Sequence, residues 1–220
     1  MKKNYLAQPA FVLNVMLVIC GFIGLIISCI NLKASMFEYY TQDSNIFCLI
    51  SALIYVIASI RAQKAGKELP KWVAKVRYLA TCTVTVTFLV VIFVLAPMFE
   101  NILYGYYLMF FNGANFFYHV TCPLLSIVSY VFWEHEDSNA AKDPLIALIP
   151  TAVYAAVTIV LNILRLIEGP YPFLMVHQQT PLASVAWCAT ILLIAWLIAV
   201  VIRGMHNRNY ARFMKYEKEN

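Results

Sequence analysis

Six long apolar segments alternate with shorter polar ones along this chain. The apolar segments are residues 10–31, 41–60, 78–98, 113–133, 144–166 and 182–202. Each is long enough to cross a hydrocarbon core about 30 Å thick, which takes roughly 20 residues of α-helix. Transmembrane β-strands would alternate apolar and polar residues over about ten positions, whereas these segments are continuously apolar. The pattern therefore predicts an all-α membrane protein with six transmembrane helices.

The composition agrees with this fold class. Of the 220 residues, 62% are hydrophobic and 12% are charged, and the mean hydropathy is +0.74. A soluble domain of this size usually has about 25% charged residues. The polar connections between the segments are too short to bury a core of their own. We therefore expect residues 1–220 to form a single transmembrane domain.

The basic residues predict how the chain is oriented. Of the 16 lysines and arginines, 14 fall at the chain ends or in the connections that share their side of the membrane, and only Lys33 and Arg165 fall on the other side. The side rich in basic residues is expected to be cytoplasmic, so both termini are predicted to be inside. The formal charge of +5 then belongs to a collar beside the membrane surface and does not indicate nucleic-acid binding. With no targeting signal recognised, a plasma-membrane location is expected.

The cysteines and histidines predict neither a metal site nor a cofactor. No C-x-x-C pair is present, and neither His119 nor His177 has a second ligand three or four residues away. Packing explains the cysteines, which all lie within the apolar segments: Cys20, Cys29, Cys48, Cys82, Cys122 and Cys188. Cys122 lies near His119 in the sequence and is kept as an alternative nucleophile.

One polar cluster, Thr41–Asn45, opens the second apolar segment. Thr41, Ser44, Asn45 and Cys48 follow the spacing i, i+3, i+4 and i+7, so they share one face of a helix. Polar side chains in a membrane are costly unless they face the protein interior, which makes the cluster a candidate site. Capping of the helix start and hydrogen bonding between helices explain it equally well.

A second polar position, His119, lies inside the fourth apolar segment between Asn115 and Pro123. Counting from the predicted cytoplasmic end of that segment places His119 about 21 Å along the helix, in the outer half of the membrane. Thr41 falls at the same outer level, as do Asn162 and Arg165. A buried imidazole can act as a general base near neutral pH. A hydrogen bond that joins two helices is the alternative role.

The order of these residues resembles the androgen-induced gene family of multispan membrane hydrolases, including its bacterial six-span relatives. Thr41 follows Phe37-Glu38-Tyr39-Tyr40, His119 precedes Pro123, and the tetrapeptide Tyr171-Pro172-Phe173-Leu174 follows the fifth apolar segment.

The resemblance implies an intramembrane esterase in which Thr41 is the nucleophile and His119 its partner. Animal members cleave fatty-acid esters of hydroxy fatty acids, so a lipid or fatty-acyl ester is the implied substrate. This chain has Ser44 where the animal proteins carry an acidic residue. The residue that orients His119 is therefore not identified by the resemblance.

The chemistry of an ester hydrolase adds further candidates. A threonine hydroxyl needs a base within hydrogen-bonding reach, and the oxyanion that forms on attack needs preorganised donors. Arg165 has the geometry to bind a lipid carboxylate, although an anchoring role at the interface explains it equally well. The other substrate-binding or oxyanion candidates are Ser44, Asn45, Asn115 and Tyr171.

Two other functions fit the same pattern. A small-solute transporter or channel would also place polar residues on an internal path, but that path should continue through the inner half of the membrane. A non-catalytic scaffold would use the polar clusters only to pack helices. The sequence predicts no oligomeric state.

Overall fold

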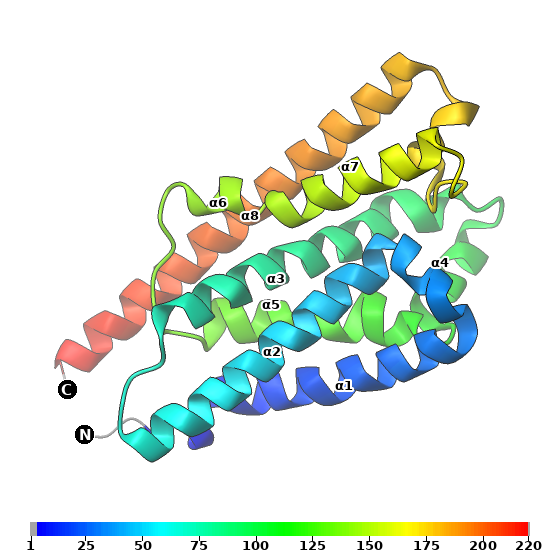
Figure 1. The fold of residues 1–220 in the computed structure, drawn as a ribbon. Helices are drawn as coiled ribbons and strands as arrows, with labels where there is room; N and C mark the ends of the chain where they lie inside the picture. Colours follow the sequence, from blue (N-terminus) through cyan, green and yellow to red (C-terminus); the bar gives the residue numbers. More distant parts are fainter. Residues whose placement is uncertain (1–3, 220) are drawn as a thin grey trace.

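The computed structural model describes residues 4–219, and these residues form helices and their connections, with no strand among them (Figure 1). Five of the helical stretches are long and apolar enough to cross a membrane, and the number rises to six if one bent pair counts as a span. The prediction of an all-α, multi-pass membrane protein is confirmed. Lys2 and Lys3, which the orientation rule also uses, lie outside the described residues.

The chain forms a bundle whose first three long helices run alternately up and down (Figure 1). Helix α1 packs on α2 and α5, α2 packs on α3, and α3 packs on α5 and α8. The α-helices are α1 Pro9–Leu32, α2 Tyr40–Ala65, α3 Lys71–Val90, α4 Ile102–Phe111, α5 Cys122–Phe132, α6 Asp143–Ile146, α7 Ile149–Ile163 and α8 Pro181–Glu219.

The bundle has two ends, the terminal end and the site end. At the terminal end, α1 begins and α8 ends (Figure 1). At the site end lie residues 33–39, α4 and residues 164–180, which connect α7 to α8. Helix α8 has 39 residues and is therefore about 58 Å long, so it extends well beyond the predicted segment 182–202 at the terminal end.

The predicted segment 113–133 is not one regular helix. It contains a π-helical turn, Phe116–Thr121, followed by α5. Pro123 explains the turn, because it has no N–H to donate to the carbonyl four residues earlier and its ring crowds that carbonyl. The carbonyl in question belongs to His119. Helix α4 precedes this turn at a bend of 91° and, at ten residues, is too short for the apolar pattern to predict as a span.

The start of α2 differs from a side-chain-capped helix. The helix begins at Tyr40 after an extended Tyr39, and the side chain of Tyr39, the cap residue, makes no hydrogen bond to the first N–H groups of the helix. Thr41 lies inside the first turn. Capping therefore does not explain why Thr41 is polar.

A buried ion pair lies toward the terminal end, between α3 and the residue that follows the last turn of α5. Arg77 and Glu134 are both 0% exposed, and Arg77 Nε lies 3.1 Å from Glu134 Oε1. The other two Arg77 nitrogens donate to the hydroxyls of Ser51 and Ser126. Asn14 donates to Glu134 at 2.9 Å. Arg77 is one of the 14 basic residues that the sequence analysis assigned to the collar beside the membrane surface. For Arg77 that assignment is wrong.

Candidate active site

Four of the residues predicted for the site line one recess at the site end of the bundle. The recess has a volume of about 480 Å³ and receives Thr41 from α2, Tyr171 from the α7–α8 connection, and His119 and Asn115 from the segment that enters α5. The remaining wall is mostly apolar and is formed by Leu32, Tyr39, Gln42, Leu95, Met98, Phe99, Met109, Pro170 and Pro172. Side chains from four distant parts of the sequence therefore meet there.

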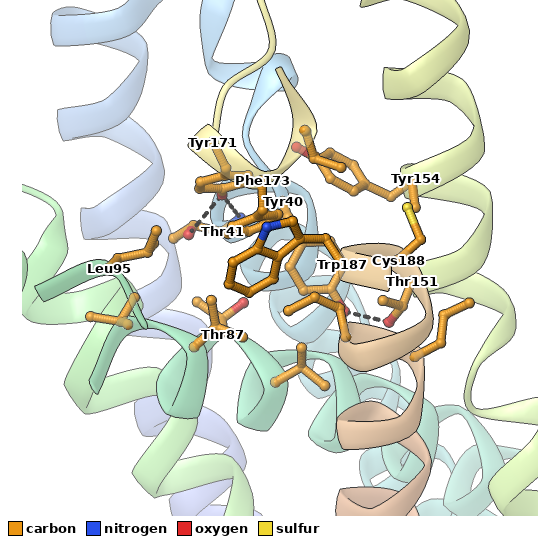
Figure 2. Close-up of a pocket in the computed structure, with 17 residues that line it drawn as sticks. Tyr40, Thr41, Thr87, Leu95, Thr151, Tyr154, Tyr171, Phe173, Trp187 and Cys188 are labelled. Atoms are coloured by element: carbon orange, nitrogen blue, oxygen red, sulfur yellow. Dashed lines mark hydrogen bonds between the residues drawn. The ribbon is translucent and has the colours of Figure 1, made fainter. Parts of the chain in front are cut away.

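Thr41 is buried, with 7% of its surface exposed, and both its backbone and its side chain approach Tyr171. The Thr41 N–H donates to the Tyr171 hydroxyl at 3.3 Å, and the two hydroxyl oxygens are 3.4 Å apart (Figure 2). Because Thr41 lies in the first turn of α2, the partial positive charge of a helix N-terminus acts on it. That charge favours a negative group at this point.

His119 is 5% exposed, and a backbone carbonyl holds its ring in place. Its Nδ1 lies 2.5 Å from the carbonyl oxygen of Met109 in α4. A carbonyl can only accept, so Nδ1 carries the proton and Nε2 of the neutral ring has a free lone pair. Helix α4 thus supplies the orienting group that the sequence does not identify. The free Nε2 has the protonation state that a general base needs.

Thr41 and His119 are not hydrogen-bonded to each other in the part of the chain that the structure describes. The Thr41 hydroxyl has Tyr171 as its partner, and His119 has Met109. Both side chains line the same recess. Hydrogen bonds between catalytic groups are often longer without substrate than in the complex, so this arrangement is compatible with a nucleophile–base pair.

Two of the predicted donors, Ser44 and Asn45, do not line the recess. Ser44 Oγ lies 2.8 Å from the Thr87 hydroxyl and 3.1 Å from the Thr41 carbonyl. Asn45 Nδ2 donates to the carbonyls of Thr41 and Tyr118, at 2.8 and 3.0 Å. The hydrogen bonds to Thr87 and Tyr118 connect α2 to its neighbours, and the two from Asn45 occupy its amide donors.

Asn115 and Arg165 differ in whether they line the recess. Asn115 lines the recess, and its Nδ2 donates to the Leu108 carbonyl at 2.9 Å. Arg165 follows the end of α7 with a positive φ of 58°, and its side chain is exposed. It is not among the residues that line the recess.

Tyr171 is positioned by the tetrapeptide Tyr171–Leu174. Its ring stacks on Phe173 with the centroids 5.2 Å apart, and Phe173 and Leu174 are both buried. Burial raises the pKa of Tyr171 to about 12, although the hydrogen bonds with Thr41 oppose part of the rise. The phenol therefore keeps its proton at neutral pH and can act as a donor.

Gln42 is a recess residue that the sequence analysis did not select. It is 4% exposed, and its Oε1 is buried without a hydrogen-bond partner among the described residues. An unpaired buried amide oxygen is costly, which is unusual unless a ligand or water completes it. Its position within the polar cluster Thr41–Asn45 is the sequence feature that could have identified it as a site residue. Helical spacing excluded it because Gln42 is not on the face that Thr41 shares with Ser44 and Asn45.

Thr41 also lines a second hollow, the apolar cavity, whose lining residues Figure 2 shows. Its volume is about 50 Å³. Thr41 and Tyr171 line both the apolar cavity and the recess. Its other lining residues are Tyr40, Val86, Thr87, Val90, Val91, Leu95, Thr151, Tyr154, Ala155, Phe173, Leu174, Trp187, Cys188, Ile191 and Leu192.

The metal and Cys122 alternatives can be compared with these hollows. Within residues 4–219, no three His, Cys, Asp or Glu side chains are grouped so that they could hold a metal ion. Cys122, the alternative nucleophile, packs in an apolar cluster with Cys48 and Tyr118 and is not among the residues that line the recess.

Comparison of this chain with family models, with curated proteins and with solved structures finds no match. The resemblance to the androgen-induced gene family therefore stays a prediction from short motifs.

Proposed function

We propose that this protein is an intramembrane lipid ester hydrolase of the androgen-induced gene family, with Thr41 as nucleophile and His119 as base. One observation carries the proposal. Thr41 and His119, whose Nδ1 is hydrogen-bonded to a backbone carbonyl, are buried side chains that line the same recess. A hydroxyl and a free imidazole nitrogen beside a hollow are the two groups that nucleophilic ester cleavage requires.

The reaction proceeds in two steps. His119 Nε2 takes the Thr41 hydroxyl proton as the oxygen attacks the ester carbonyl. The carbon–oxygen bond to the alcohol then breaks, and His119 returns the proton to the departing alkoxide, which leaves an acyl group on Thr41. Water attacks this acyl-threonine while His119 takes its proton, and the bond to the Thr41 oxygen breaks as His119 gives that proton to it, so the products are a carboxylic acid and free Thr41.

One donor at the site suits the oxyanion of each step. The Tyr171 hydroxyl accepts from the Thr41 N–H at 3.3 Å, at the positive end of α2, and its own proton can be donated to a substrate. Tyr171 is buried and protonated at neutral pH, so it can donate to a developing negative charge. Ser44 and Asn45 have no part in this role, because their hydrogen bonds lie elsewhere.

The proposed topology has six spans, with residues 113–133 as the fourth, and both termini in the cytoplasm of a cell bounded by the plasma membrane. The excess of basic residues at the terminal end supports this orientation. The recess then lies at the outer leaflet, where a lipid ester brings its ester group to headgroup level. The family resemblance makes fatty-acid esters of hydroxy fatty acids the first substrates to test.

A transporter or channel is the less favoured function. A conducting path would have to continue toward the terminal end, where Arg77 and Glu134 are fully buried and hydrogen-bonded to neighbouring helices. That packing supports a recess that is closed on the side of the terminal end.

The test is hydrolysis of a lipid ester by the purified protein in detergent. Thr41→Ala should lower kcat/KM by about 10⁴-fold or more, and His119→Ala by about 10²- to 10⁴-fold. Ser44→Ala is the matched control, because it removes a hydroxyl from the same turn of α2 that does not line the recess. Equal activity of Thr41→Ala and the parent protein would exclude the proposed mechanism.

A further inference from the structure

Thr41 lines both the recess and the apolar cavity, so a group bound to its hydroxyl can reach either hollow. In the proposed reaction His119 returns its proton to the alcohol oxygen, so the alcohol lies on the side of Thr41 where His119 is. His119 lines the recess and is not among the residues that line the apolar cavity. The alcohol half of the ester then occupies the recess, and the acyl half extends from its carbonyl into the apolar cavity.

The wall of the apolar cavity suits an acyl chain. It is built mostly from aliphatic and aromatic side chains of α3, α7, α8 and the tetrapeptide Tyr171–Leu174. Two of its polar groups, the hydroxyls of Tyr40 and Thr151, are hydrogen-bonded to each other at 2.7 Å. Figure 2 shows the rings of Tyr40, Phe173 and Trp187 among the side chains that line the cavity. A wall of this kind favours a hydrocarbon chain over a polar group, which would be left without a hydrogen-bond partner there.

The apolar cavity is open at the surface of the bundle. Trp187 lines the cavity and is 38% exposed, and its ring packs on Phe173 with the centroids 5.7 Å apart. Among the residues of α8, the first that is buried is Ala195, so the part of the helix that borders the cavity does not pack deeply against its neighbours. Figure 1 shows this part of α8 at the edge of the bundle. A chain that is longer than the cavity can therefore continue past Trp187 into the bilayer.

The lining residues of α8 also give the cavity a direction. They fall on two successive turns, Trp187 and Cys188 followed by Ile191 and Leu192. These residues therefore form a strip that runs along the helix from the site end toward the terminal end. The acyl chain of a lipid runs the same way, from headgroup level toward the middle of the membrane.

We propose that the acyl chain of a long-chain lipid ester binds in the apolar cavity, with α8 as its outer wall, and extends past Trp187 into the bilayer, while the alcohol half binds in the recess. This assignment rests on the proposed function, since it takes Thr41 and His119 as the reacting pair. It agrees with fatty-acid esters of hydroxy fatty acids as substrates. It also sets no upper limit on the length of the acyl chain, because the chain can leave the cavity on the lipid side.

Quenching of tryptophan fluorescence by bromine tests which half of the ester lies in the apolar cavity. Octadecyl dibromooctadecanoate and dibromooctadecyl octadecanoate carry the same bromines on the acyl half and on the alcohol half. Each is bound to Thr41→Ala in detergent, in a protein that keeps Trp187 and has Phe in place of Trp72, Trp133 and Trp196. We expect the acyl-brominated ester to quench Trp187 about twofold more than its isomer, because bromine quenches an indole at contact distance. Equal quenching by the two esters, or stronger quenching by the alcohol-brominated one, overturns the assignment.

Trp196 provides the matched control. It lies on the same helix and is 37% exposed, close to the 38% of Trp187, but it lines neither hollow. In a second protein that keeps Trp196 alone, the two esters should quench to the same extent. If the acyl-brominated ester quenches Trp187 and Trp196 equally, it is merely dissolved in the micelle, and the assignment is overturned.

Two adjacent alanines of α7 provide a matched pair of variants. Ala155 lines the apolar cavity, whereas Ala156 does not and is exposed on the helix surface. Ala155→Phe should lower the ratio of kcat/KM for hexadecyl hexadecanoate to that for hexadecyl acetate by about tenfold, because the added ring takes the place of the chain. Ala156→Phe adds the same ring outside the cavity and should leave the ratio unchanged. An unchanged ratio in Ala155→Phe, in a protein that still hydrolyses the acetate, overturns the assignment.

The fluorescence experiment does not depend on catalysis, so this assignment and the proposed function can fail separately. Selective quenching of Trp187, together with no hydrolysis of any ester by the parent protein, would support the cavity as an acyl site and overturn the hydrolase. Hydrolysis that requires Thr41 and His119, without selective quenching of Trp187, would support the hydrolase and overturn the acyl site.

Discussion

Two of the buried polar regions of the protein differ in how their groups are paired. The network around Arg77 and Glu134 lies toward the terminal end, and the group around Thr41 and His119 lies at the site end. In the first region, each of the three Arg77 nitrogens donates a hydrogen bond. In the second, within residues 4–219, one imidazole nitrogen accepts no hydrogen bond and Gln42 Oε1 has no partner.

The two regions also differ in whether a hollow lies beside them. The Arg77 network also has an atom without a partner among the described residues, Asn14 Oδ1, but Asn14 lines neither hollow. The Thr41 group stands between two hollows. Polarity in a membrane interior is therefore not enough to mark a function. Incomplete pairing beside a cavity is the more informative sign, because a ligand can complete it.

The largest expected difference between the regions is in stability. Arg77→Ala should lower the free energy of unfolding by about 3–5 kcal/mol, because it leaves Glu134 buried without a counter-charge. Replacing both partners, as Arg77→Met with Glu134→Leu, should recover most of this loss. Unfolding in detergent, followed by circular dichroism, measures both variants.

Lys75→Ala is the control for the Arg77 experiment. Lys75 lies two residues before Arg77 on α3 and pairs with Asp143 at 2.7 Å, but its side chain is 36% exposed. This pair should contribute less than about 1 kcal/mol. If Arg77→Ala costs no more than Lys75→Ala, the ion pair is not the structural element inferred from its burial.

A smaller effect is expected on catalysis when Tyr171 loses its hydroxyl. Tyr171→Phe keeps the ring that stacks on Phe173 and should leave stability nearly unchanged. If the hydroxyl stabilises the oxyanion, kcat should fall by about 10²- to 10³-fold, which corresponds to about 2.7–4 kcal/mol. Initial rates on a lipid ester measure the change.

Tyr106→Phe is the matching control, because it removes a hydroxyl that donates to the Ile92 carbonyl near the site without lining either hollow. Equal rates for Tyr171→Phe and Tyr106→Phe would remove Tyr171 from the mechanism.

Much of the fold could be predicted from hydrophobicity, because a membrane span needs a long apolar run. The same rule fails at α4, whose ten residues are too few to span. It also fails to predict that Arg77 is buried, because a basic residue next to an apolar segment is assigned to the loop that precedes the segment. Only the packing of α3 against the end of α5 reveals that Glu134 neutralises it.

The candidate site could be predicted in part. The polar cluster at the start of α2 and the histidine before Pro123 indicated Thr41 and His119, which do line one recess. Sequence spacing could not separate Ser44 and Asn45 from them, because hydrogen bonds to other helices decide where those side chains point. The carbonyl that orients His119 was also beyond prediction, since every residue has a carbonyl and only the bend before α5 selects Met109.

The central claim, that Thr41 is a nucleophile activated in a buried recess, is tested most directly by covalent labelling. The purified protein is treated with a lipophilic fluorophosphonate, which forms a stable adduct with activated hydroxyls, and the modified peptide is identified by mass spectrometry. The account predicts a single adduct on Thr41 that is lost in His119→Ala. An adduct on a different residue, or undiminished labelling of Thr41→Ala, would contradict it.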